Sequence, residues 1–244
     1  THAITMSHFT DEQIRAQMKE AIGEEKGGET KIISFCCNWC SYAGADFAGV
    51  SRFQYPPNTR IVRVMCSARV DPVFGLDALE RGADGVLVTG CHLQDCHYID
   101  GNLETLRRCN LLQEVLRKYG MGERIRLEWV SASEGQKFAQ ITREFVERVK
   151  SLGPLSEDDR KNLRILRHVF DGRKLRLVLG LARKTIKKGV PEETYHERLL
   201  KTALDEVEAA RGQIKTDGQN KIPVFISSTS EDLKRHREAV WRGL

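Results

Sequence analysis

No stretch of this sequence approaches the roughly 20 consecutive apolar residues that a membrane-spanning helix requires. The first thirty residues also lack the apolar centre of a secretory signal peptide, because acidic side chains such as Asp11, Glu12 and Glu20 interrupt them. Internal repeats and low-complexity segments are missing as well. We therefore expect a globular protein that has no membrane span and is located in the cytoplasm.

The sequence is equally poor in motifs for bond-making catalysis. It contains no phosphate-binding glycine loop, no recognisable Ser-His-Asp motif and no paired carboxylates on one predicted element. The net charge of +5 is modest and charges of both signs are mixed along the chain, so no nucleic-acid-binding surface is indicated. These absences argue against an enzyme that makes or breaks bonds by itself.

What the sequence does contain is a concentration of cysteine. Six of its seven cysteines lie in one stretch, as Cys36, Cys37, Cys40, Cys66, Cys91 and Cys96. In the reducing cytoplasm, grouped cysteines are more often metal ligands or redox catalysts than disulfide partners. The seventh, Cys109, falls inside a predicted helix, and we interpret it as a small buried apolar residue.

Four short β-branched runs alternate with helical segments. The runs are residues 31–36, 60–65, 84–89 and 126–130. This alternation implies a parallel sheet with right-handed crossovers. The sequence thus predicts a doubly wound, flavodoxin-like α/β fold with a mainly parallel four-stranded sheet, an N-terminal helix and a C-terminal helical extension. The expected divisions are residues 1–30, 31–155 and 156–244.

Capping residues mark three of the expected helix starts. They are Thr10 for a helix through about residue 25, Asp71 before Pro72 for the helix after the second strand, and Ser133 with Gln136 for a helix ending near residue 152. Each signal supplies a side-chain acceptor for backbone N–H groups that have no partner within the helix.

Each group of cysteines follows directly on one predicted strand. Cys36, Cys37 and Cys40 follow the first, Cys66 the second, and Cys91 and Cys96 the third. The carboxyl ends of parallel strands lie along one edge of the sheet, and ligands bind there where the strand order reverses. We therefore expect these thiols to meet at one edge and to bind a metal centre.

An iron–sulfur cluster with two irons is the favoured occupant, because it needs four converging thiolates and six are available. Zinc is the main alternative, although structural zinc usually sits in small modules that need the metal to fold. A thioredoxin-like dithiol at Cys37 and Cys40 is a third interpretation, but it leaves the other thiols unexplained. His92 and His97 are candidate donors to sulfur or, as in Rieske-type sites, candidate ligands.

The region after residue 155 is expected to be helical. Apolar residues recur at helical spacing, as Leu163, Leu166, Val169 and Phe170, and as Leu199, Leu200, Ala203, Leu204 and Val207. Between them, residues 173–188 hold seven basic residues and no acidic one, which indicates either a solvated helix face or a docking surface for an acidic partner. Residues 222–226 could form a short edge strand.

Four ordered motifs carry a resemblance to a known family. They are FCCNWCSY at residues 35–42, RVMCS at 63–67, GADGV at 82–86 and GCHLQDCHY at 90–98, and WVSASEG at 129–135 agrees as well. Over about residues 31–155 the chain closely resembles the delta subunit of methyl-viologen-reducing hydrogenase.

This resemblance implies a non-catalytic electron-transfer subunit of an anaerobic redox complex. Such a protein carries one [2Fe-2S] cluster and relays electrons between a hydrogenase, or a formate dehydrogenase, and the flavin-bearing subunit of heterodisulfide reductase. A zinc-stabilised assembly module with no redox role is the alternative.

The motifs hold more cysteines than the four ligands that the cluster needs. We favour Cys40, Cys66, Cys91 and Cys96, with Cys36 or Cys37 as competitors, because adjacent strand residues point to opposite faces.

Overall fold

The structure is a computed structural model that describes residues 6–23, 29–187, 189 and 191–216. The described residues up to Val207 belong to one compact unit, whereas the end of the last helix, from Glu208 onward, is assigned to a second. The features below lie in the first unit. The predicted strand at residues 222–226 falls outside the described residues.

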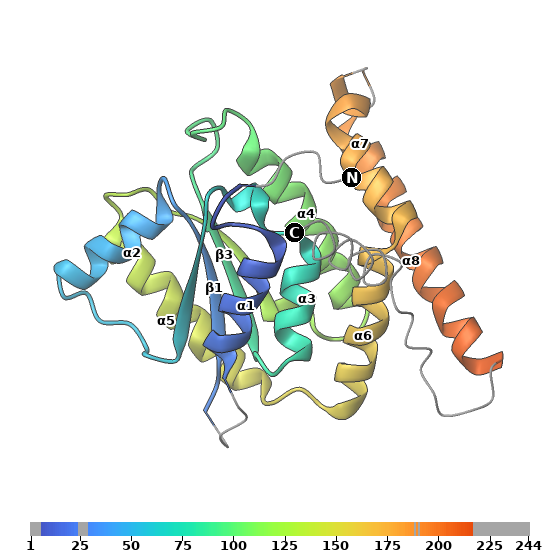
Figure 1. The fold of residues 1–244 in the computed structure, drawn as a ribbon, viewed down its shortest axis with the longest axis horizontal. Coiled ribbons are helices and arrows are strands. Elements are labelled where there is room, and N and C mark those ends of the chain that lie inside the picture. Colours follow the sequence, from blue (N-terminus) through green and yellow to red (C-terminus); the bar gives the residue numbers. More distant parts are fainter. Residues whose placement is uncertain (1–5, 24–28, 188, 190, 217–244) are drawn as a thin grey trace, which may run out of the picture. The chain divides into compact units, whose positions relative to one another are not determined.

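A four-stranded parallel sheet forms the centre of the first unit (Figure 1). Its strands are β1 (Ile32–Cys37), β2 (Thr59–Val64), β3 (Gly85–Gly90) and β4 (Ile125–Trp129), in the order β2-β1-β3-β4. Ile32 pairs with Thr59 on one side and with Gly85 on the other. The strand order therefore reverses at β1, which confirms the predicted α/β fold and puts the switch point where the first cysteines lie.

Eight helices accompany the sheet in the described residues. They are α1 (Asp11–Ile22), α2 (Ser41–Val50), α3 (Pro72–Glu80), α4 (Gly101–Arg117), α5 (Gly135–Leu152), α6 (Glu157–Asp171), α7 (Arg173–Lys187) and α8 (Glu192–Thr216), with two 3-10 turns, η1 (Ser67–Arg69) and η2 (Gly122–Arg124). Helices α2 and α5 cover one face of the sheet, and α1, α3 and α4 cover the other (Figure 1). Both faces of the sheet are thus buried.

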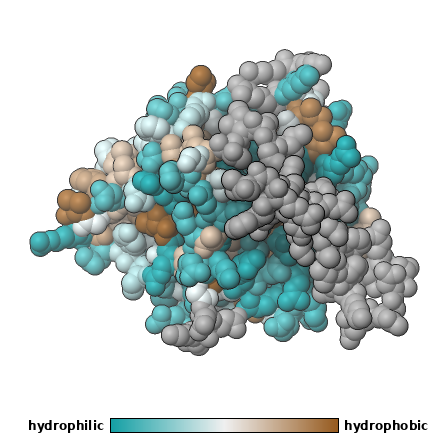
Figure 2. All heavy atoms as spheres, viewed as in Figure 1, coloured by the Kyte–Doolittle hydropathy of each residue, from teal (hydrophilic) through white to brown (hydrophobic). Residues whose placement is uncertain are grey.

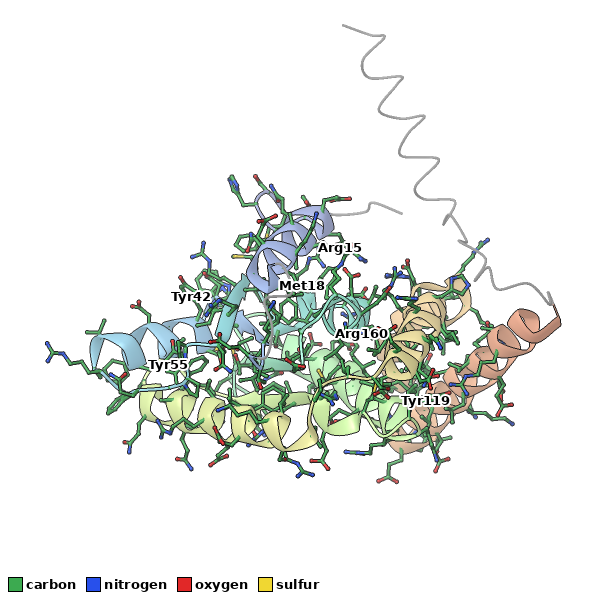
Figure 3. The ribbon with its side chains drawn as sticks, turned by 90° about the horizontal axis from the view of Figure 1, so that it is seen from below. Arg15, Met18, Tyr42, Tyr55, Tyr119 and Arg160 are labelled. Atoms are coloured by element: carbon green, nitrogen blue, oxygen red, sulfur yellow. The ribbon has the colours of Figure 1, made fainter. Side chains whose placement is uncertain are left out.

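Hydrophobic packing holds these layers on the sheet. In Figure 3, Met18 lies on the side of α1 that faces the sheet, and it is fully buried. On the opposite face, Tyr55 lies between α2 and α5 and meets the ring of Phe138 edge-on, with 5.5 Å between ring centroids (Figure 3). The phenyl rings of Phe35 and Phe74 stack at 6.4 Å and join β1 to α3. Such aromatic pairs add stabilisation beyond their buried area.

Two glycines allow α2 to lie close to the start of α5. A Cβ atom on Gly44 would lie 2.7 Å from the carbonyl oxygen of Ser131, and one on Gly135 would lie 2.7 Å from the backbone nitrogen of Ala48. A larger side chain at either position would force the backbones apart.

The helix starts at Thr10 and Asp71 are confirmed, but the predicted capping box at Ser133 is wrong. Thr10 accepts from Gln13 N–H, and Asp71 accepts from Val73 N–H with Pro72 in the first turn. Helix α5 begins instead at Gly135, and no side chain caps it. The carboxylate of Glu134 turns back to accept the N–H of Ser131 at 2.7 Å, which closes a local turn ahead of the helix.

The C-terminal helical extension is present and packs on the α/β layers. Helix α6 lies against α3 and buries all four of its predicted apolar residues, Leu163, Leu166, Val169 and Phe170. Helix α8 buries Leu199, Ala203 and Val207, whereas the predicted inward residues Leu200 and Leu204 are only half buried. Arg176 of α7 pairs with Asp71 at 2.9 Å.

The face of the molecule seen in Figure 2 is largely polar. In the view of Figure 2 hydrophilic residues predominate, and hydrophobic ones gather over α2, whose exposed apolar residues include Phe47 and Val50. Among the described helices, none combines the length and the apolar character that crossing a bilayer requires.

Candidate metal site

Three thiols meet at the carboxyl edge of the sheet. The sulfur atoms of Cys37, Cys40 and Cys91 all lie within 4.8 Å of one another, and those of Cys37 and Cys91 are 4.0 Å apart. Cys37 ends β1, Cys40 directly precedes α2, and Cys91 follows β3. The switch point between β1 and β3 therefore gathers thiols from both strands, as the order of the sheet predicts.

Two further thiols extend this group toward α4. A Cβ atom placed on Gly101 would lie 2.7 Å from the sulfur of Cys66 and 3.3 Å from that of Cys96, so both sulfur atoms lie against the first residue of α4. Cys66 also interacts with the thiol of Cys37. Cys37 thus links the two subgroups, and five of the six cysteines singled out from the sequence come together. We refer to these five as the thiol group.

The sixth cysteine, Cys36, lies apart from the thiol group. Its side chain packs in an apolar cluster with Ala45, Ala48 and Phe138 between β1 and the α2/α5 layer. Burial raises the pKa of its thiol, and its sulfur lies 3.5 Å from Ser34 Oγ. Adjacent residues of a strand face opposite sides of the sheet, which explains why Cys37 enters the thiol group and Cys36 does not.

Cys109 is buried within α4, as predicted, and burial raises the pKa of its thiol to about 12. All seven cysteines lie within the described residues and all are free thiols. Cys109 therefore behaves as a small apolar side chain, and the polar chemistry of cysteine is confined to the thiol group.

Ionisation of the thiol group is strongly uneven. Hydrogen bonds from the thiols of Cys37 and Cys40 lower the pKa of Cys91 to about 2. The pKa of Cys37 is raised, mainly by its interaction with Cys40. The pKa of Cys66 is raised by its interaction with Cys37 and by burial. One thiolate is stable here, but further thiolates repel each other unless a cation replaces the protons.

Local hydrogen bonds explain how the sequence builds the first part of the site. Ser41, the first residue of α2, accepts the N–H of Cys37 at 2.9 Å and donates to the carbonyl of Thr89 at 3.0 Å. One buried hydroxyl thus ties the end of β1 to the end of β3 and to the start of α2. This hydroxyl fixes the spacing of the two strand ends that carry Cys37 and Cys91.

An open cavity of about 280 Å³ lies beside the thiols. It is lined by Trp39, Cys40, Cys91, His92, Asp95, His97, Ser131 and Ala132. The rings of Trp39 and His97 stack with 3.8 Å between centroids, and Trp39 Nε1 donates to Tyr98 Oη at 3.2 Å. Trp39 is 44% exposed. The aromatic residues therefore form a partly solvent-facing rim, and the imidazole of His97 is engaged in stacking.

Sequence reasoning missed two residues that hold the loop after β3. Glu134 Oε2 lies 2.6 Å from His92 Nε2. Asn102 is buried and donates to the carbonyls of Cys91 at 3.2 Å and His92 at 2.6 Å. Glu134 belongs to the motif WVSASEG, which was the available signal, whereas no motif marks Asn102.

The donor set and its surroundings fit a metal centre. Thiolates are soft ligands that select zinc and iron–sulfur centres. Five such ligands lie in a largely buried position next to a helix start, and the geometry of the thiols alone is compatible with either kind of centre.

Comparison with known proteins agrees with the motifs. Residues 32–153 match the family described as methyl-viologen-reducing hydrogenase, delta subunit. The iron-sulfur subunit of F420-non-reducing hydrogenase from Archaeoglobus profundus is 53% identical over 127 residues, which cover 52% of this chain and 93% of that protein. The corresponding iron-sulfur subunit from Methanocaldococcus jannaschii is 41% identical over 124 residues, covering 50% of this chain and 92% of that protein.

A second kind of relative is much longer than this chain. A ferredoxin/F420H2-dependent CoB-CoM heterodisulfide reductase subunit from Methanosarcina acetivorans is 47% identical over 154 residues, covering 63% of this chain and 19% of that protein. The matched part thus spans about a fifth of that relative's length. With the match over residues 32–153 and the near-complete coverage of the hydrogenase iron-sulfur proteins, the chain belongs to the family of the methyl-viologen-reducing hydrogenase delta subunit.

Proposed function

We propose that this chain is an electron-transfer subunit that carries one [2Fe-2S] cluster. The observation that supports this most strongly is the convergence of five thiols at the switch point of the sheet. A [2Fe-2S] cluster held there would accept and donate one electron at a time. The chain's own residues supply the thiolates and limit the access of water.

The proposed ligands come from Cys37, Cys40, Cys66, Cys91 and Cys96. Five thiols exceed the four that such a cluster takes, so one of them serves as a neighbour rather than a ligand. Cys36 was a candidate from the sequence, but its place in the apolar cluster beside Phe138 argues against it. The proximity of Cys37 to both subgroups makes it a stronger candidate than the sequence alone suggested.

We further propose that the chain relays electrons in the cytoplasm between a hydrogenase or formate dehydrogenase and a flavoprotein similar to the flavin-bearing subunit of heterodisulfide reductase. The names of the relatives support this assignment, since both kinds of protein are subunits of such enzymes. The partly exposed rim of Trp39 and His97 supports an exchange of electrons close to the protein surface.

Residues 156–244 are the proposed partner-docking extension. Helix α7 exposes Leu177 and Leu181 one turn apart, with the basic residues Arg173 and Lys184 exposed at either end of that row. Exposed apolar residues rimmed by charge are typical of interaction surfaces. Replacing Leu177 and Leu181 together by serine should weaken co-purification with partner proteins. The control is Val50→Ser, which alters an exposed apolar residue on α2.

Zinc is the competing occupant, and with it the chain would be an assembly module without a redox role. The two proposals are separated by measuring iron, acid-labile sulfide and zinc in the protein purified without oxygen. The cluster predicts about two irons and two sulfides per chain. Zinc without sulfide would overturn the electron-transfer proposal.

A further inference from the structure

The first turn of α4 contacts both loops that carry the later cysteines. From this turn Asn102 reaches the loop after β3 and donates to the carbonyls of Cys91 and His92. Its Oδ1 is buried and has no hydrogen-bond partner among the described residues. A buried acceptor without a partner is unfavourable, so the amide is held in this place by what its N–H groups bind.

The same turn also anchors the loop after β2. Thr105 Oγ1 donates to the carbonyl of Gly101 at 3.0 Å and lies 2.8 Å from Ser67 Oγ, so it accepts from that hydroxyl. Ser67 directly follows Cys66 in the chain. One turn further along α4, Arg108 donates to the carbonyl of Ala68 at 2.7 Å. The two residues that follow Cys66 in the chain are therefore both held to α4.

Gly101 is the point at which the two loops meet. A Cβ atom there would lie 2.7 Å from the sulfur of Cys66 and 3.3 Å from that of Cys96, and real Cβ atoms essentially never approach another atom to under 3.0 Å. Because the hydrogen bonds of Ser67 and Thr105 hold the Cys66 loop, the sulfur atom has little freedom to move away. The two sulfur atoms thus fill the space that a side chain at position 101 would need.

We propose that Gly101 is a positioning residue of the thiol group, and that α4 holds Cys66 and Cys96 side by side through Gly101 and Thr105. This inference rests on the proposed function only in requiring that the thiols bind a metal. It adds that metal binding depends on a residue that offers no ligand atom.

The test compares Gly101→Ala with Gly49→Ala in the full chain. Gly49 lies in α2, and a Cβ atom there would have nothing within 4 Å, so this control makes the same substitution in open space. We expect Gly101→Ala to bind metal roughly 10- to 100-fold more weakly, as when groups that orient ligands are removed. Its remaining cluster should give a shifted electron paramagnetic resonance spectrum. Wild-type iron and sulfide content with an unchanged spectrum would overturn the inference.

A second measurement separates this inference from the proposed function. The reduced metal-free protein is titrated with Cd²⁺, and the cadmium–thiolate absorption per bound ion reports how many sulfurs bind. Gly101→Ala should show a smaller absorption than wild type and Gly49→Ala should not. This comparison holds even if the wild-type protein is found to carry zinc. Equal absorption in all three proteins would contradict the role of Gly101.

A third variant covers the case in which Gly101→Ala does not fold. Thr105→Val keeps the shape of the side chain and removes only the hydroxyl that accepts from Ser67. It should fold and still show reduced cadmium–thiolate absorption. An absorption equal to that of the wild type would overturn the anchoring role of α4.

Discussion

The carboxylate of Glu134 lies 2.6 Å from the imidazole of His92 and joins two loops at the carboxyl edge of the sheet. His92 stands next to Cys91, and Glu134 closes the turn between β4 and α5 by accepting the N–H of Ser131. The loop that carries Cys91 and Cys96 is thereby fixed to the opposite side of the cavity. This contact gives the acidic residue of the WVSASEG motif a structural role in the site.

Glu134→Gln should destabilise the protein more at neutral pH than in acid. Burial raises the pKa of Glu134, yet hydrogen bonds from His92 and from Ser131 N–H lower it from 4.5 to about 2. A carboxyl with a lowered pKa stabilises the fold above its unfolded-state value, and this contribution is lost as the pH falls from about 4.5 toward 2. Because the pair is partly exposed, we expect at most about 1 kcal/mol.

Urea unfolding at pH 7 and pH 3 measures this effect. The difference between the wild type and Glu134→Gln should be larger at pH 7 than at pH 3. A difference that stays constant between the two values would show that the charge of Glu134 contributes nothing.

Single cysteine substitutions should divide into two classes. Cys66→Ala, Cys91→Ala and Cys96→Ala remove members of the thiol group and should each lower the content of iron and acid-labile sulfide. Cys36→Ala and Cys109→Ala remove buried thiols that lie outside this group and should keep the metal, with a loss of stability of about 1 kcal/mol. Metal analysis of the purified variants decides, and loss of the metal in Cys36→Ala would show that the ligand set is wrong.

Gly135→Ala should destabilise the fold by about 1–3 kcal/mol, since its Cβ atom would meet the backbone nitrogen of Ala48 at 2.7 Å. Gly49→Ala, on the exposed side of α2, should be neutral or stabilising by up to about 1 kcal/mol, because alanine favours helix. Thermal or urea unfolding of the two variants measures the difference. Equal stabilities would mean that α2 and α5 can separate without cost.

Phe170→Ala should cost about 3–5 kcal/mol of unfolding free energy, because its ring is fully buried on α6, a helix that packs against α3. The matched control is Leu177→Ala in the next helix, whose side chain is 60% exposed and whose loss should change stability by less than about 0.5 kcal/mol. If Phe170→Ala unfolds like the wild type, α6 does not share the core of the α/β layers. A large effect would also mean that removing residues 156–244 disturbs the α/β layers, so that substitutions on the surface of α7 are the better test of docking.

Much of this architecture could be read from local patterns. The β-branched runs predicted all four strands within about a residue, and Thr10 and Asp71 marked true helix starts because their side chains cap the next turn. The parallel direction of the strands predicted that the six cysteines meet at one edge of the sheet, and five of them do. The choice between Cys36 and Cys37 could not be predicted. The alternation of side chains along a strand indicates that the two point to opposite faces, but only the packing of Cys36 against Phe138 shows that Cys37 is the one in the thiol group.

Other features depend on contacts between distant segments and left no local signal. Ser133 and Gln136 have the spacing of a capping box, but Glu134 competes for the same turn and forms it with Ser131. No local pattern marks Gly101 in the sequence. Its need for glycine arises from Cys66 and Cys96, which reach it from two different loops.

The most direct test of the thiol group as a cluster site is the electron paramagnetic resonance spectrum of the full chain, purified without oxygen and then reduced. We expect the signal of a reduced [2Fe-2S] cluster in the wild type and in Cys109→Ala, and its loss in Cys91→Ala. A wild-type protein that is loaded with metal and silent, or a signal that survives in Cys91→Ala, would contradict the assignment of the thiol group as the cluster site.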